Sequence, residues 1–259
     1  MTEPWTLALV AGLFGLALGS FLNVCSLRWP RDESVVSPRS RCPGCGAGIA
    51  WYDNLPVLSW LLLRGRCRQC GEGISVQYPM VELATGLIWG GMFLLHGLEW
   101  EALRAGLFLT ILLGITVSDA RFYIIPDQFS LGGLVIGLGL AFLVPTLAWH
   151  QALLGAAVGL ALLWFVAGAG EKAFGKEARG GGDIKMMAMV GAFLGWQGVL
   201  LTIFLGSFLG AVIFGPISLK TGKLVPFGIF LAAGAAVAYG WGDALVGWYL
   251  EWAFGPPPA

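Results

Sequence analysis

The sequence has little charge. Only 12% of its 259 residues are charged, whereas 57% are hydrophobic, and soluble globular chains carry about 25% charged residues. No soluble fold of this length has enough interior for so much apolar surface, so the expected solvent is a lipid bilayer. The formal net charge is zero. Without a basic surface, nucleic acid is not an expected partner.

Two familiar signals are also missing. Residues 1–20 contain no Lys or Arg, so the first apolar run lacks the basic region of a secretory signal peptide. We therefore expect residues 5–27 to be a retained membrane helix. No G-x-G-x-x-G follows a strand, so no ordinary nucleotide-binding domain is indicated.

Apolar runs dominate what is present. A membrane span needs about 20 residues, and the eight candidate runs are 5–27, 79–97, 103–118, 128–149, 151–170, 186–197, 198–218 and 225–250. The run 186–197 is short, so it is either a partial span or begins earlier, at Asp183. Forty glycines favour close packing of such helices. The sequence predicts an all-α polytopic membrane protein with about eight transmembrane helices, seven being the alternative.

Basic residues are unevenly distributed. Fourteen of the 15 Lys and Arg residues lie in the segments 28–78, 119–127, 171–185 and 219–224, and the remaining one is Arg104. With eight spans these four segments share one side of the membrane. The positive-inside rule then places them in the cytoplasm and both termini outside.

Four of the five cysteines lie in two matching blocks, Arg41–Ile49 and Arg66–Ile74, which both read R-C-x-x-C-G-x-G-I. Two C-x-x-C pairs about 20 residues apart are typical of structural zinc sites, and four thiolates favour tetrahedral Zn²⁺. Two disulfides are the alternative, less expected in a cytoplasmic loop. The metal ligands predicted are Cys42, Cys45, Cys67 and Cys70. Cys25, in the first apolar run, is expected to be a buried thiol.

Two aspartates lie at the ends of apolar runs. Asp119 ends one run, and Asp183 opens another after the triglycine Gly180, Gly181 and Gly182. Each alone is equally well explained as a solvated helix end or a cap. Together they suggest a pair that shares a proton, one acting as base toward water and the other as acid. The triglycine would then admit a substrate backbone.

Three further charged residues have open roles. Asp127 follows Pro126 and is either a helix cap or a third acid. Glu82, near the start of a membrane helix, either reaches the cytoplasmic edge or binds a cationic leader or a cofactor amine. Lys185 is expected to bind lipid phosphate or a substrate carbonyl.

These motifs resemble the type IV prepilin peptidase family. The segment Gly180–Lys185 fits its G-x-G-D-x-K signature, and Ser118–Asp127 is similar to its first aspartate segment. N-terminal segments match as well, namely Gly19–Val24, Pro38–Pro43, Tyr52–Trp60, Arg64–Cys67 and Tyr78–Glu82. Many members have an acid where this chain has Arg121.

The resemblance implies a bifunctional enzyme of the bacterial inner membrane, serving type IV pili and type II secretion. Asp119 and Asp183 would cleave the basic leader of prepilins and pseudopilins at the cytoplasmic face. The enzyme would then N-methylate the new terminal residue with S-adenosylmethionine. The expected divisions are a first helix (1–27), a small cytoplasmic zinc-ribbon-like insertion (28–78), and a multi-helix membrane domain with the peptidase site (79–259).

Two other functions fit parts of the pattern. A presenilin-like intramembrane protease shares the G-x-G-D motif, but places tyrosine before its first aspartate, where this chain has Ser118. A proton-carrying transporter or an assembly scaffold would also hold membrane acids. Acids in a transporter more often lie in mid-span, and neither role explains the cysteine blocks.

Overall fold

The protein is helical throughout the part of the chain that the computed structural model describes, residues 3–174, 180–221 and 226–255. Within those ranges the only β pairing is two isolated bridges, and six helices are long and apolar enough to cross a membrane. Many of their large apolar side chains are exposed, including Leu13 and Phe14, as expected of surfaces that face lipid tails. The predicted class of polytopic α-helical membrane protein is confirmed.

The count of eight spans is not confirmed. The runs predicted at 186–197 and 198–218 lie in one helix, α7 (Gly181–Thr221), which is interrupted only at Gly195, where φ is 69°. The helix that contains the run 186–197 begins at Gly181. It therefore starts before the apolar run, as in the alternative that put the start earlier, at Asp183. The run predicted at 128–149 overlaps α5 (Asp127–Leu140), which has only 14 residues.

The orientation of the spans stays a prediction. Lys176, Arg179 and Lys223 lie outside the described residues, as does the side chain of Lys220. The positive-inside rule gives this orientation only when the chain has eight spans.

The described chain divides into two compact units, residues 1–118 and 119–259. The first contains α1 (Pro4–Arg28), η1 (Trp29–Arg31), η2 (Trp51–Asn54), α2 (Leu58–Leu62), α3 (Gln77–His96) and most of α4 (Trp100–Phe122). Small residues let α1 and α3 approach closely: a Cβ on Gly19 would lie 2.6 Å from Cα of Glu82. The hydroxyl of Ser26 on α1 donates to the carbonyl of Gly114 on α4, so three helices form one bundle.

The loop between α1 and α3 is held by its own contacts. The indole of Trp60 donates to the carbonyl of Ile74 at 3.0 Å. Arg68 makes a bidentate ion pair with Asp53, with one N–O distance of 2.6 Å, and its guanidinium lies 5.6 Å from the ring centre of Tyr52. Arg68 lowers the pKa of Asp53 by hydrogen bonding to its carboxylate. The insertion is therefore ordered around η2 and the second cysteine block.

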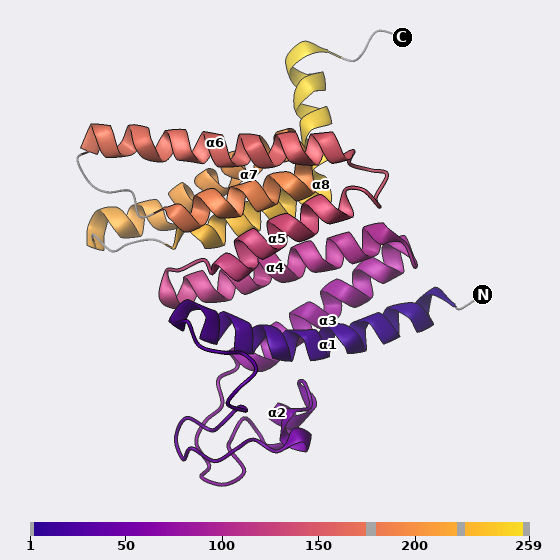
Figure 1. Ribbon diagram of the computed structural model, residues 1–259, viewed down its shortest axis with the longest axis vertical. Coiled ribbons are helices and arrows are strands. Elements are labelled where there is room, and N and C mark those ends of the chain that lie inside the picture. The colour runs from indigo at the N-terminus through magenta and orange to yellow at the C-terminus, as the bar shows by residue number, and fades with distance from the viewer. Residues whose placement is uncertain (1–2, 175–179, 222–225, 256–259) are drawn as a thin grey trace. The chain divides into compact units, whose positions relative to one another are not determined.

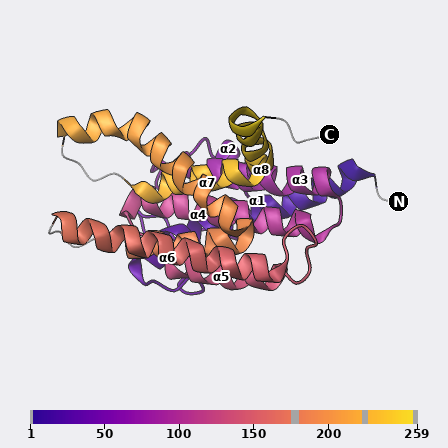
Figure 2. The ribbon, with the colours of Figure 1, turned by 90° about the horizontal axis from the view of Figure 1, so that it is seen from above.

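The second unit contains the end of α4, then α5, α6 (Trp149–Phe174), α7 and α8 (Phe227–Phe254). Helices α6 and α7 meet at Gly155 and Gly191, where a Cβ on either residue would collide with the backbone of the other helix. Figures 1 and 2 both show α6 beside part of α7. This tight packing fixes the start of α7, which carries Asp183.

Candidate functional site

The four cysteines of the two blocks come together as predicted. Their sulfur atoms all lie within 4.8 Å of one another, and Sγ of Cys42 is 3.7 Å from Sγ of Cys70. Four sulfurs about 2.3 Å from a tetrahedral Zn²⁺ would be about 3.8 Å apart. All five cysteines are free thiols. The donor set and its spacing thus fit a four-thiolate metal site rather than disulfides.

The two blocks fold into the same turn. The N–H of Cys42 donates to the carbonyl of Ala47, and that of Cys67 to the carbonyl of Glu72. Bridges Arg41↔Gly48 and Arg66↔Gly73 close the two turns in the same way. The glycine after each second cysteine has positive φ, 70° at Gly46 and 75° at Gly71, where a side chain would be strained. The sequence repeat is therefore a repeat of backbone geometry.

The electrostatics of the cluster favour a bound cation. Backbone N–H groups of Cys70 and then Gln69 lower the pKa of Cys67 to about 7. The pKa of Cys70 is raised to about 12, because desolvation and the neighbouring thiols outweigh the lowering effect of the Glu72 N–H. One thiolate forms readily, and the remaining thiols lose their protons when a metal ion neutralises the added charge.

Asp119 is not a solvated helix end. It lies in the last turn of α4 and is only 5% exposed. A carboxylate near a helix C-terminus is disfavoured by the helix dipole. The start of α8, in the same unit as Asp119, compensates for this effect. The N–H of Ile229 donates to Oδ2 of Asp119 at 3.1 Å. A buried acid at an unfavourable position, stabilised by another helix, is typical of a functional group.

Asp183 lies in the first turn of α7, two residues after the helix begins, so it is not the capping residue itself. Ile125 lies next to Gly182, the residue before Asp183, and next to Gly228. A Cβ on Gly182 would lie 3.0 Å from Cβ of Ile125, and a Cβ on Gly228 would lie 2.8 Å from Cδ1 of Ile125 and 2.9 Å from Oδ2 of Asp119. The residue before Asp183 and the residue beside Asp119 therefore both pack against Ile125, which follows α4.

Sequence reasoning missed the residues that hold Asp119. Gly228 and Ile229 follow Pro226 at the start of α8, and neither carries a chemical group that draws attention. The available signal was Pro-Phe-Gly at the start of an apolar run, which marks a helix N-terminus with free N–H groups. Only the fold shows that these groups face an acid 110 residues earlier.

Lys185 and Asp127, whose roles were left open, form an ion pair with an N–O distance of 2.7 Å. Asp127 is the first residue of α5, whose N-cap position is occupied by Pro126. The pair thus joins the starts of α5 and α7. Both side chains stay about half exposed, 41% and 54%, so the pair adds little stability.

Glu82 serves the fold of the insertion. Its Oε2 accepts the N–H of Val57 at 2.7 Å. Val57 has φ of 59°, a conformation that costs a β-branched residue about 1–3 kcal/mol. The buried carboxylate, 7% exposed, therefore holds a strained loop residue against α3.

Two family models match the chain. Residues 13–96 match the family model described as the bacterial peptidase A24 N-terminal domain, and residues 106–215 match that of the type IV leader peptidase family. No solved structure matches the chain.

Several relatives bear the name prepilin leader peptidase/N-methyltransferase. The protein of Aeromonas hydrophila is 37% identical over 95% of each chain, and that of Bacillus subtilis is 33% identical over 94% of this chain and 98% of the relative. The Myxococcus xanthus protein is 43% identical over 83% of this chain, and the match covers 64% of that longer protein. The resemblance drawn from the motifs is confirmed, and the chain belongs to the type IV leader peptidase family.

Proposed function

We propose that this protein cleaves the leader peptide of type IV prepilins and pseudopilins and then N-methylates the new terminal residue. The observation that supports the proposal is the packing of Gly182, next to Asp183, and of Gly228, beside Asp119, against the same Ile125, while the N–H of Ile229 donates to Asp119. The names of the relatives supply the substrate and the second activity. The match to leader peptidase models favours this function over a presenilin-like protease or a transporter.

The two aspartates have different surroundings, which suggests different roles. N–H groups at the start of α8 stabilise the charged form of Asp119, so Asp119 is the expected base. It would take a proton from water as the water oxygen attacks the scissile carbonyl carbon. Asp183 would hold the proton that goes to the carbonyl oxygen, because two adjacent carboxylates do not both ionise readily. As the C–N bond breaks, the leaving nitrogen takes the proton that Asp119 accepted, and one hydroxyl of the tetrahedral intermediate returns a proton to Asp183. No covalent intermediate with the enzyme forms.

The first unit contains the cysteine loop, which we propose binds structural Zn²⁺ and serves methyl transfer. S-adenosylmethionine would supply an electrophilic methyl group. The neutral terminal amine attacks the methyl carbon, the C–S bond breaks with its electron pair going to sulfur, and the amine then loses a proton. Cys42, Cys45, Cys67 and Cys70 would hold the metal and thereby the shape of the loop.

The remaining sequence predictions are part of the same proposal. The division into 1–27, 28–78 and 79–259 assigns the metal loop to the cytoplasm and the peptidase site to the later helices. The triglycine and Lys185 would border the substrate backbone beside Asp183. The protein would lie in the bacterial inner membrane with its catalytic face toward the cytoplasm, where the basic leader is presented.

The direct test uses the purified protein in lipid with a prepilin peptide and S-adenosylmethionine, read by mass spectrometry. We expect the peptide to lose its leader and then gain the mass of one methyl group on the new terminal amine. Cleavage without methylation would leave a peptidase alone, and an uncut peptide under conditions in which the protein is folded would reject the proposal.

The α8 contact predicts the effect of a conservative substitution. Gly228→Ala should lower the rate of leader cleavage by about 100-fold, since a shift of about 1 Å in a catalytic group has that effect. The added Cβ would lie 2.9 Å from Oδ2 of Asp119. Gly240→Ala, in the same helix with no neighbouring atom within 4 Å of the new Cβ, is the matched control. Equal cleavage rates for the two variants would show that α8 does not position Asp119.

A further inference from the structure

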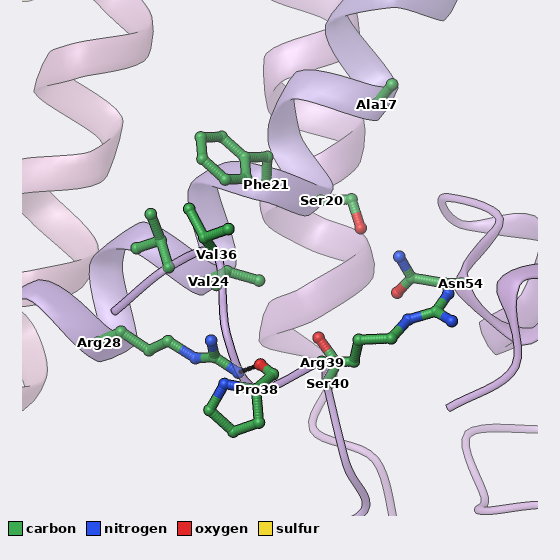
Figure 3. A pocket seen from close by; sticks show the side chains of 11 residues that line it. Ala17, Ser20, Phe21, Val24, Arg28, Val36, Pro38, Arg39, Ser40 and Asn54 are labelled. Carbon is green, nitrogen blue, oxygen red and sulfur yellow. Dashed lines mark hydrogen bonds between the residues drawn. The ribbon is translucent and has the colours of Figure 1, made fainter. Parts of the chain in front are cut away.

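A pocket of about 290 Å³ in the first unit is not used by the features described above. It lies between the C-terminal end of α1 and the loop that precedes the first cysteine block (Figure 3). Small-molecule sites usually measure about 300–1,000 Å³, with an apolar wall and a few polar groups. The volume is at the lower end of that range, so the pocket can hold part of a nucleoside-sized molecule.

The two arginines of the pocket differ in what they do. Arg28 donates to the carbonyls of Ser34 and Pro38, each at 2.8 Å, and thereby holds the loop that forms one wall. The guanidinium of Arg39 has no hydrogen-bond or ion-pair partner among the described residues. Figure 3 shows Arg28 turned toward Pro38 and Arg39 reaching away from it, toward Asn54. Arg39 is thus the free cation, with a fork that suits a carboxylate.

The rest of the lining is divided between apolar and polar groups. Phe21 and Val36 form an apolar side, and the amide of Asn54 and the hydroxyls of Ser20 and Ser40 supply donors and acceptors. Ser20 follows Gly19, where α1 packs against Cα of the buried Glu82. Glu82 therefore lies next to this wall of the pocket, and the guanidinium of Arg39 projects from the loop. A ligand that carries both a carboxylate and a cationic centre fits this pattern.

We propose that this pocket binds S-adenosylmethionine, with Arg39 pairing with its carboxylate and Glu82, next to the pocket wall, favouring the cationic end. The inference rests on the proposed methyltransferase function and gives that function a site. The molecule has the required charges, a flat aromatic base that can lie on the apolar side of the pocket, and a ribose with two hydroxyls. The pocket then lies in the first unit, which also contains the metal loop, whereas Asp119 and Asp183 belong to the second unit.

The basic leader of a prepilin is a poor occupant for the same pocket, because Arg28 and Arg39 would repel it. A phospholipid headgroup would satisfy Arg39, but it leaves the polar groups of Asn54 and Ser40 unexplained. The charge pattern therefore favours the methyl donor.

The test measures methylation of a precleaved pilin peptide by the full-length protein in lipid, with varied S-adenosylmethionine. Arg39→Ala should raise KM for the donor about 10-fold to 100-fold, as expected for a charge-assisted hydrogen bond, and leave leader cleavage unchanged. Arg39→Lys should recover part of the loss, because it keeps the charge but not the fork. Arg64→Ala, which removes an equal charge from the same loop outside the pocket, should leave KM near the wild-type value.

The second arm uses decarboxylated S-adenosylmethionine. The wild-type protein should prefer the carboxylated donor, and Arg39→Ala should lose that preference. An unchanged KM in Arg39→Ala would overturn the proposal, as would an equal rise for both donors. If Arg39→Ala changes only the response to phosphatidylglycerol in the bilayer, the occupant is a lipid headgroup and the proposal is wrong. No methylation by the wild-type protein would instead reject the transferase function itself.

Discussion

Asp119→Asn and Asp183→Asn should each abolish leader cleavage while the protein still inserts and folds. An asparagine keeps the shape of the side chain, but it can neither take a proton from water nor give one to the carbonyl oxygen. One positioned acid or base contributes about 10²–10⁴-fold to a rate. The measurement is the rate of prepilin cleavage in lipid.

Methylation shows whether a variant that no longer cleaves the leader is still folded. Asp119→Asn should still methylate a peptide supplied already cleaved, because the proposed methyl transfer uses neither aspartate. Asp243→Asn removes an exposed carboxylate of α8 and should cleave at the wild-type rate. Full cleavage by either Asp119→Asn or Asp183→Asn would remove the pair from the mechanism.

Loss of a metal ligand should have the next largest effect. The purified protein should contain about one Zn²⁺, held by four thiolates. Cys42→Ser or Cys67→Ser should lower the metal content and loosen the loop, since binding of a structural metal is coupled to folding of its site. Methylation should fall at least as far as cleavage. Metal analysis together with both activity assays measures this.

Cys25→Ser is the control for the metal experiment. Cys25 is buried in α1 and lies outside the cluster, so its replacement should leave the zinc content unchanged. Disulfide bonds among the four cysteines in freshly isolated membranes would contradict the metal assignment and would place the loop outside the cytoplasm.

Local patterns in the sequence were enough to predict several features. Low charge and long apolar runs predicted a helical membrane protein, since a bilayer requires every backbone polar group to be paired within a helix or barrel. The repeated R-C-x-x-C-G-x-G-I block predicted the four-cysteine cluster, because each block holds two ligands and its turn glycine within nine residues. The G-x-G-D motif led to the family.

Other features depend on segments far apart in the chain. Apolar runs do not show where a helix is continuous, so the two runs joined in α7 were counted as separate spans. The role of Glu82 became clear only when the fold placed it beside Val57, 25 residues earlier. In the same way, the pairing of Lys185 with Asp127 joins residues separated by 58 positions.

The sequence by itself determined the environment of this protein, its cysteine cluster and the two acids worth testing, because each follows from composition or short-range spacing. The tertiary structure alone decided what surrounds those acids. Gly228 and Ile229 have no reactive group, and their importance comes from a backbone N–H that reaches Asp119 from another helix. A hydrogen bond to a main-chain donor depends on where the helix lies and not on the identity of its side chain.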